Sequence, residues 1–389
     1  HFRMLFLVAM LLRNCGVRAL TQPLRLPALS PGEAEFSRWL NAELAQHHAM
    51  RARYADILDE GANAILKWRR RHYGTPLWKR LMKSRMVKEL VECAPVIAST
   101  RDFIAQRFDG RRYTIVDLAS GKGFLSMYLS EMLDPAHVEN CVLVDKCWSY
   151  SAWRQKYHNS NATTTAAPDD DDDDSLLPHD SQHDDSKEKK KKKGEPQKIN
   201  AEHIYCEEYA WPIELVTSKQ DLKSKSTLRS MRRVILQKSE GPIILLGVHL
   251  CGTLSLRALD LFNDNSDLCE LLVLKPCCLP PIVHADRRDT FAVGQHEFDA
   301  TEVAARGFFR GTEWVDGPPR KSLEPKFQRW ASHLLAGADV QSTGGRKALA
   351  SAPVQVDGGF QNAFIFAEHG PSTTPVFWDG LDRRGLLRE

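Results

Sequence analysis

Asp117 and the glycine-rich turn that follows it have the residue types and the spacing of a nucleotide-binding site. Asp117 ends an apolar segment that begins at Tyr113, and the small-residue turn 119–123 (ASGKG) comes next. Glycine lets such a turn bend tightly and lets a ligand approach without a Cβ atom in the way. A helix is predicted to begin at Phe124, and the N–H groups of its first turn can bind a polar or negative group. The order of strand, turn and helix therefore predicts a nucleotide site.

Asp145 is the second carboxylate of this kind. It ends the apolar segment 141–145, which is the next strand predicted along the chain. A carboxylate at that strand end can accept hydrogen bonds from both hydroxyls of a ribose. A dinucleotide motif needs a third glycine three residues after Gly123, but Ser126 lies there. The pattern therefore disfavours a nicotinamide oxidoreductase.

The run DLASGKGF (117–124) resembles the first motif of class I S-adenosylmethionine (SAM) methyltransferases. The resemblance implies an α/β fold with a Rossmann-like sheet of seven strands and an antiparallel end, and SAM as the cofactor. It also implies that cofactor contacts come from this motif and from later strand ends. Those residues are Asp117, Ala119, Ser120, Gly121, Gly123, Asp145, Lys146, Glu207 and His249. The alternative is a Rossmann-like domain whose site is degenerate and empty.

Two further motifs follow predicted strands and narrow the resemblance. HLCG (249–252) ends the strand 243–249, and KPCC (275–278) follows the strand 271–274. Together they resemble a branch that includes the tRNA acceptor-stem 2′-O-methyltransferases, and SRMVKELVE (84–92) resembles the short helix that this branch carries ahead of its first motif. The resemblance covers about residues 80–285. The chain departs from the branch in having Cys-Cys-Leu-Pro in place of Cys-Cys-His-His and in having no zinc-finger cysteines.

His249 and Lys275 are the candidate catalytic bases. Methyl transfer to a weak nucleophile such as a ribose hydroxyl is helped by a group that removes the proton. Histidine titrates near neutral pH, and a buried lysine can have a lowered pKa. The alternatives are a histidine that is only hydrogen-bonded in the crevice and a lysine at the surface or on a phosphate.

The cysteines allow two interpretations. Cys277 and Cys278, with His249 and Cys251, make a metal site or a nucleophile conceivable, but adjacent residues on a strand point to opposite faces. We therefore predict small buried thiols and no metal site. The chain has nine cysteines in all, with no CxxC pair, which favours reduced thiols over disulfides or a zinc finger.

The 389 residues suffice for one large or two modest domains. We predict a targeting segment over 1–30, a helical extension over 31–108, the SAM-dependent methyltransferase domain over 109–370 and a tail over 371–389. A charged insertion, 159–198, contains six consecutive aspartates and a lysine block and is predicted to be disordered. Two further strands are expected over 203–209 and 353–357, the latter in a hairpin with 362–368, and helices over 150–157, 221–238, 253–262 and 322–337.

The net charge and the hydropathy of the chain limit which binding partners and which cellular location the sequence predicts. The net charge of +3 gives no overall signature of a nucleic-acid-binding protein. The basic stretch 68–88 is either the solvated face of helices, with Trp68 and Trp78 packed inward, or a phosphate-contacting surface. The apolar segment 4–12 is flanked by arginines, which fits either a signal or organelle-targeting segment or an ordinary helix, and it is too short to span a bilayer. We expect a cytoplasmic or organellar protein.

Methyl transfer to RNA is the leading prediction of function, with a role in tRNA processing implied by the resemblance. A protein side chain is the second candidate acceptor. The alternative from another class is a SAM-fold module that binds a partner without turnover.

Overall fold

The computed structural model describes residues 30–82, 85–149, 151–153, 198–207, 209–310, 313–354, 361–370 and 375–387. The chain divides into two units, residues 1–39 and 40–389. In the first, Ser30 and Glu33 exchange hydrogen bonds at the start of helix α2 (Pro31–Ala45), as in a capping box. The predicted targeting segment up to residue 29 and the charged insertion up to residue 197 lie outside the described residues.

The second unit is built on a seven-stranded sheet in the order β10–β11–β5–β4–β1–β2–β3. β1, β2, β3, β4 and β5 run parallel, and β11 is antiparallel to both β5 and β10. This arrangement confirms the predicted class I methyltransferase sheet with its antiparallel end. The strands are β1 (Tyr113–Leu118), β2 (Val138–Val144), β3 (Glu214–Ser218), β4 (Ile243–Cys251), β5 (Cys269–Cys278), β10 (Arg346–Ser351) and β11 (Ala363–Glu368).

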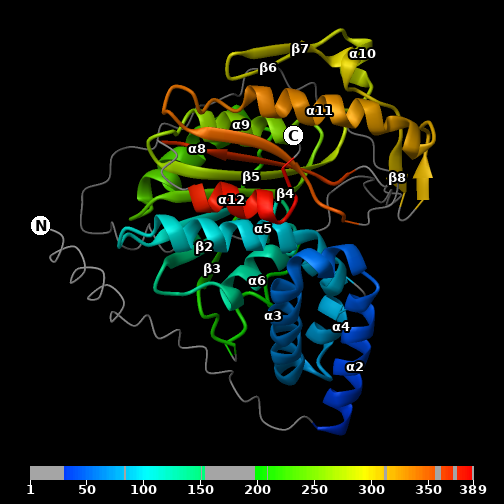
Figure 1. Cartoon of the computed structure of the whole chain (residues 1–389), viewed down its shortest axis with the longest axis vertical. Helices are drawn as coiled ribbons and strands as arrows, with labels where there is room; N and C mark the ends of the chain where they lie inside the picture. The colour runs from blue at the N-terminus through cyan, green and yellow to red at the C-terminus, as the bar shows by residue number, and fades with distance from the viewer. Residues whose placement is uncertain are drawn as a thin grey trace, which may run out of the picture. The chain divides into compact units, whose positions relative to one another are not determined.

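Helices cover both faces of this sheet (Figure 1). On one face lie α5 (Arg85–Arg107), α6 (Phe124–Met132) and α12 (Pro375–Arg383), with α3 (His48–His72) packed on α5 and α6. The other face carries α8 (Lys225–Val234), α9 (Leu254–Asn263) and α11 (Glu324–Gly337). Coverage on both sides explains why the central strands β4 and β5 begin as almost continuous apolar runs instead of alternating ones.

Short elements complete the second unit. α4 (Pro76–Met82) follows α3, and η1 (Leu236–Lys238) follows α8. Two small hairpins and three short helical segments lie between β5 and α11 in the chain. The hairpins are β6 (Thr290–Val293) with β7 (His296–Asp299), and β8 (Phe308–Arg310) with β9 (Glu313–Val315). The helical segments are α10 (Val283–Asp286), η2 (Ala300–Glu302) and η3 (Arg320–Leu323).

Three segments differ from the sequence-based expectation. The third strand is β3, whereas the predicted strand 203–209 forms turns in its described part. The first strand of the terminal hairpin is β10, which ends at Ser351, so the predicted strand 353–357 was placed several residues too far toward the C-terminus. Residues 375–383, predicted as part of a tail, form α12, whose Phe377 ring lies 5.4 Å from that of Phe103 on α5. The tail thus contributes to the packing of the second unit.

The basic stretch 68–88 is divided by the fold. Trp68 and Trp78 are buried, as expected for aromatic residues packed inward. Arg85 and Lys88 are exposed at the start of α5, where they form i,i+4 ion pairs with Glu89 and Glu92. None of the described helices combines the length and the apolar character needed to cross a membrane.

Candidate active site

The carboxyl ends of β1, β2 and β4 bring three predicted site residues to one edge of the sheet. In the parallel ladders Asp117 is paired with Leu143 on one side and with Leu246 on the other. Asp145 and His249 follow these partners closely in sequence. Ligands of open α/β sheets bind at this edge.

The turn 119–123 has the backbone conformation that its sequence predicts. Ala119, Gly121 and Gly123 have φ values of 53°, 55° and 80°. A Cβ atom on Gly123 would lie 2.3 Å from Leu143 Cδ2, whereas a Cβ atom on Gly121 would meet nothing within 4 Å. Gly123 therefore permits close packing on β2, and Gly121 leaves open space at the mouth of the site.

Asp145 is held by backbone donors. Its Oδ2 accepts a hydrogen bond from the Gly121 N–H at 3.1 Å, and its Oδ1 accepts one from the Cys147 N–H at 2.8 Å. Each carboxylate oxygen keeps a further lone pair for a ligand hydroxyl. Asp145 also lines a cavity of about 170 Å³. The other lining residues are Ala119, Lys146, Cys147, Gln220, Asp221, Leu222, Lys223 and Leu254. This half-open carboxylate, between a glycine turn and an apolar wall, fits the ribose of a bound nucleoside.

Asp117 is buried beneath this turn and accepts a hydrogen bond from Ser126 Oγ at 2.8 Å. Burial raises the pKa of Asp117 to about 7, although the Ser126 hydrogen bond and the charge of His249 act in the opposite direction. Among the described residues, those that line the small cavity do not include Asp117.

The remaining predicted cofactor contacts are placed differently. Ser120 Oγ accepts a hydrogen bond from Trp148 Nε1 at 3.3 Å, and Lys146 is exposed on the cavity wall. Glu207 is exposed in a turn and is not among the described residues that line the cavity, where the acid beyond β3 is Asp221. We missed Asp221 because we placed the third strand at 203–209, ahead of its actual position in the chain. The available signal was the short β-favouring segment 213–218 (IELVTS), with an acid three residues after it.

The two candidate bases meet carboxylates from α5. His249 Nε2 lies 3.0 Å from Glu89 Oε2, and Lys275 Nζ lies 3.6 Å from Glu92 Oε2. The His249 side chain is 42% exposed, whereas that of Lys275 is 2% exposed. Burial acts to raise the pKa of Glu89, but the hydrogen bond and charge of His249 outweigh it, so that the net shift is downward. Glu89 is therefore ionised and can only accept, so His249 Nε2 is the donor, and in the neutral form of the ring Nδ1 carries the lone pair.

We did not single out Glu89 and Glu92 from the sequence, although both lie in the segment 84–92 that carries the resemblance. Their spacing of three residues on α5 puts both carboxylates on one face of the helix. No local pattern indicates that this face meets the ends of β4 and β5.

Three thiols lie together at the ends of β4 and β5. Cys251 Sγ is 3.1 Å from Cys277 Sγ, which is 3.7 Å from Cys278 Sγ. The hydrogen bonds of the other two thiols lower the pKa of Cys251, and their hydrogen bonds to Cys251 raise the pKa of Cys277 and Cys278 in turn. The expectation that the neighbouring cysteines point apart is therefore wrong, and so is the expectation of buried thiols, because Cys251 is exposed and Cys277 and Cys278 are only partly buried.

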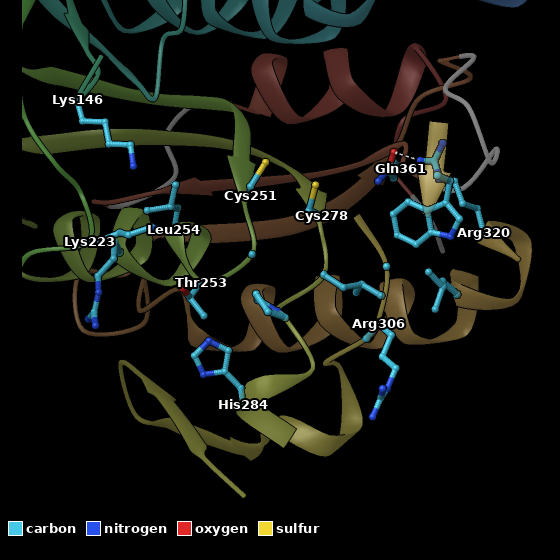
Figure 2. Close-up of a pocket in the computed structure, with 18 residues that line it drawn as sticks. Lys146, Lys223, Cys251, Thr253, Leu254, Cys278, His284, Arg306, Arg320 and Gln361 are labelled. Atoms are coloured by element: carbon cyan, nitrogen blue, oxygen red, sulfur yellow. Dashed lines mark hydrogen bonds between the residues drawn. The ribbon is translucent and has the colours of Figure 1, made fainter. Parts of the chain in front are cut away.

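A second cavity, of about 800 Å³, opens beside the first. It shares Lys146, Lys223 and Leu254 with the smaller cavity. Figure 2 shows basic side chains at several places around it, with Cys251 and Cys278 at the strand ends. Among the described residues its cationic lining consists of Lys146, Lys223, Arg257, Arg306 and Arg320, and no carboxylate lines it. Trp314 adds an aromatic surface, over which Arg320 lies 5.7 Å from the ring centroid.

Three solved structures show a distant similarity to this chain. The plantazolicin methyltransferase BpumL in complex with SAH aligns with a TM-score of 0.32 and 10% identity, over 82% of this chain and 99% of that one. The CurJ carbon methyltransferase aligns with a TM-score of 0.28 and 10% identity, over 88% and 72% of the two chains. The DszA carbon methyltransferase gives 0.28 and 13%, over 87% and 71%. Comparison with curated protein sequences finds no match.

A family model described as a methyltransferase domain matches residues 83–283. The matched range begins just before α5 and ends after β5, and it therefore contains the turn 119–123, Asp145, the carboxylates of α5 and the three clustered cysteines. This range is more than half of the chain, which therefore belongs to this methyltransferase-domain family, with S-adenosylmethionine as the cofactor that the assignment implies.

Proposed function

We propose that this protein transfers a methyl group from SAM to RNA, and that the acceptor enters the 800 Å³ cavity beside the Asp145 cavity. The observation that carries this proposal is the shared wall of the two cavities, which Lys146, Lys223 and Leu254 form. A donor in the smaller cavity and an acceptor in the larger one would be neighbours. Methyl transfer depends mainly on such positioning.

The cofactor side of the proposal rests on the turn 119–123 and the acids around it. Asp145 would accept hydrogen bonds from the ribose hydroxyls while its two backbone donors hold its orientation. Asp221 and Leu222 line the same cavity and would contact the base. Glu207 lies outside this set, so Asp221 replaces it in our proposal. When bound, SAM supplies the electrophilic methyl group, and the protein supplies position and electrostatics.

The acceptor side rests on charge. Five lysine and arginine side chains line the larger cavity, and none of the described lining residues is an aspartate or a glutamate. Phosphate groups are the ligands that such a surface attracts, and a partly exposed aromatic ring such as that of Trp314 offers a surface on which a base can stack. An unmodified protein substrate has no comparable density of negative charge. RNA is therefore favoured over a protein side chain, and a ribose hydroxyl of tRNA is the specific acceptor that the sequence resemblance suggests.

His249 is our proposed proton acceptor. Among the described residues, His249 is not one of those that line either cavity, but its side chain is 42% exposed and it lies two residues before Cys251, which lines the larger one. The Glu89 carboxylate orients the ring so that Nδ1 of the neutral imidazole carries the lone pair. Lys275 is buried against Glu92, so we propose a positioning role for it, through the α5 carboxylate, instead of direct contact with the acceptor.

The decisive experiment offers methyl-labelled SAM with total RNA, with purified tRNA and with total protein. We expect label in RNA. Charge reversal at the cavity wall, Arg306→Glu, should raise the KM for RNA at least tenfold and lower the slope of log affinity against log salt by about one, because roughly one phosphate contact is lost. Arg287→Glu, at an exposed arginine outside the cavity lining, is the matched control and should leave both quantities unchanged.

Other outcomes are equally informative. Label in protein instead of RNA would establish the side-chain acceptor and contradict the RNA assignment. Label in neither fraction, with SAM binding intact by calorimetry, would favour the non-catalytic binding module. Absence of SAM binding itself would contradict the cofactor site at Asp145.

A further inference from the structure

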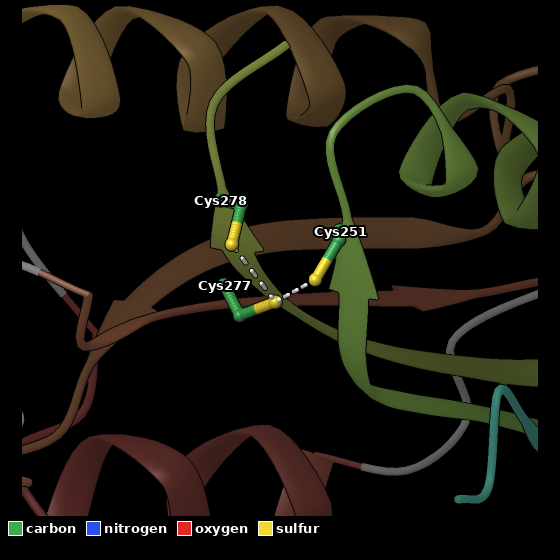
Figure 3. Close-up of side chains that lie close together, drawn as sticks. All are labelled: Cys251, Cys277 and Cys278. Carbon is green, nitrogen blue, oxygen red and sulfur yellow. Dashed lines mark hydrogen bonds between the residues drawn. The ribbon is translucent and has the colours of Figure 1, made fainter. Parts of the chain in front are cut away.

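The thiols of Cys251, Cys277 and Cys278 form a compact cluster where β4 and β5 end (Figure 3). All three sulfur atoms lie within 4.8 Å of one another. Nothing in the proposed methyl transfer uses these thiols. The cluster is preorganised, because two of its members are cross-strand partners in the sheet, Cys251 opposite Cys278.

Irregular pairing of the strand ends explains why all three side chains can converge. The register of β4 and β5 shifts between Gly247 and Leu250 and again between Leu250 and Cys251. Such bulges re-aim side chains that would alternate in a regular strand. Gly252, with a φ of 54°, then turns the chain away immediately after Cys251. Local sequence rules for strands therefore do not apply to these residues.

The distances suit a thiophilic cation. Zn²⁺ bound by thiolates at about 2.3 Å in a tetrahedron places neighbouring sulfur atoms about 3.8 Å apart. The two measured separations, 3.1 and 3.7 Å, come near this value, and small rotations about the side-chain torsions can supply the difference. Three Sγ donors without nearby hard oxygen ligands favour zinc or a softer ion over magnesium or calcium.

We infer that Cys251, Cys277 and Cys278 bind one zinc-class cation through three thiolate ligands, with a fourth coordination position open to the acceptor cavity. Cys251 and Cys278 line that cavity, so water or a group of a molecule bound there can fill the fourth position. Among the described residues, this group of possible ligands contains no histidine or carboxylate. Three protein ligands and one exchangeable position are the arrangement of reactive zinc sites, whereas structural sites have four protein ligands.

The charges around the cluster are compatible with a bound metal. Three thiolates and a divalent cation carry a net charge of −1. The positive charge of Lys275 acts on Cys251, and that of Arg320 acts on Cys278. The site would thus not add an uncompensated charge beside the acceptor cavity. This inference goes beyond the proposed function and does not depend on the identity of the methyl acceptor.

Metal content of the full chain, purified under reducing conditions without chelator, tests the inference. We expect about one equivalent of zinc by mass spectrometry. After exchange with Co²⁺, the protein should show a sulfur-to-cobalt charge-transfer band and the intense visible bands of a tetrahedral site. Cys251→Ser and Cys277→Ser should each lose the metal and the bands. Cys206→Ser, at a partly exposed thiol outside the cluster, is the control and should keep both.

Several results would overturn the inference. Zinc-free protein that also fails to bind added Co²⁺, or a metal content unchanged by the cluster variants, would contradict it. A Cys251–Cys277 disulfide in freshly purified, metal-free protein would identify a redox pair instead. The cobalt spectrum of the unaltered chain keeps the test valid if a variant does not fold. SAM binding, measured in parallel, separates loss of the metal from loss of the cofactor site.

Discussion

Glu89 on α5 and His249 at the end of β4 form a carboxylate–imidazole pair, with Oε2 and Nε2 3.0 Å apart. The two residues are 160 positions apart in the chain. Because Glu89 is only slightly exposed and His249 is nearly half exposed, the pair has one anchored member and one accessible member. This asymmetry is what a positioned general base requires.

His249→Ala should lower kcat about 100-fold or more without changing SAM affinity, since removal of a general base has roughly this effect. Glu89→Gln should lower kcat less, because the imidazole remains but its orientation and tautomer are no longer fixed. Glu89→Asp should recover part of the loss, and steady-state kinetics with a separate SAM titration checks these expectations. If Glu89→Gln changed KM or SAM affinity alone, a positioning role for Glu89 would be ruled out.

Asp145→Ala should weaken SAM binding by about 10- to 100-fold, because hydrogen bonds to a charged acceptor contribute about 1.5–3 kcal/mol. Isothermal calorimetry measures this directly. Asp264→Ala is the matched control, since Asp264 is exposed at the end of α9 and does not line either cavity. Equal affinities for the two variants would exclude Asp145 as the ribose acceptor.

Gly121→Ala and Gly123→Ala should differ in their effects, one acting mainly on SAM binding and the other mainly on the stability of the fold. Both positions have positive φ, which costs a non-glycine residue about 1 kcal/mol or more. Only Gly123→Ala also brings a methyl group against Leu143, so its total loss should reach about 2–3 kcal/mol. Gly121→Ala should lose mainly SAM affinity. Urea unfolding and SAM titration of both variants test the ranking, and the reverse order would refute it.

Asp117 should make the stability of the protein depend on pH in a defined direction. The folded state holds the Asp117 proton up to about pH 7, whereas the unfolded chain loses it near pH 4. The native state therefore binds more protons in this window, and this residue's contribution to the free energy of unfolding falls as pH rises from 4 to 7. Above pH 7 the contribution stays constant.

Asp117→Asn removes this titration, so the stability of the variant relative to the unaltered chain should increase between pH 4 and 7. Urea unfolding midpoints at intervals across this range measure the difference. Asp264→Asn serves as the control at an exposed carboxylate and should track the unaltered chain. A constant difference between the Asp117→Asn variant and the unaltered chain at every pH would contradict the raised pKa.

The cofactor-binding half of the site was predictable because each of its residues belongs to a short sequence pattern that can be recognised without knowledge of the rest of the chain. An apolar run that ends in an acid is a buried parallel strand whose end must meet a ligand or solvent, and glycines with positive φ follow from a tight turn. Asp117, Gly121, Gly123 and Asp145 therefore came from the sequence with their elements. The β3 assignment failed because the segment that begins at residue 203 contains β-favouring types, but the N–H groups of Ile204 and Tyr205 donate to the nearby Ala201 carbonyl in a turn instead of pairing with a strand.

Only the tertiary structure brought together residues that no local pattern links. Glu89 meets His249 because α5 packs across the ends of β4 and β5. Cys277 meets Cys251 because bulges override strand alternation, and the basic cavity collects side chains from residues 146 to 361. The sequence by itself determined the sheet, the cofactor turn and the methyltransferase family. The acceptor cavity and the thiol cluster depended on long-range packing, which sets which strand ends, helices and loops share one space.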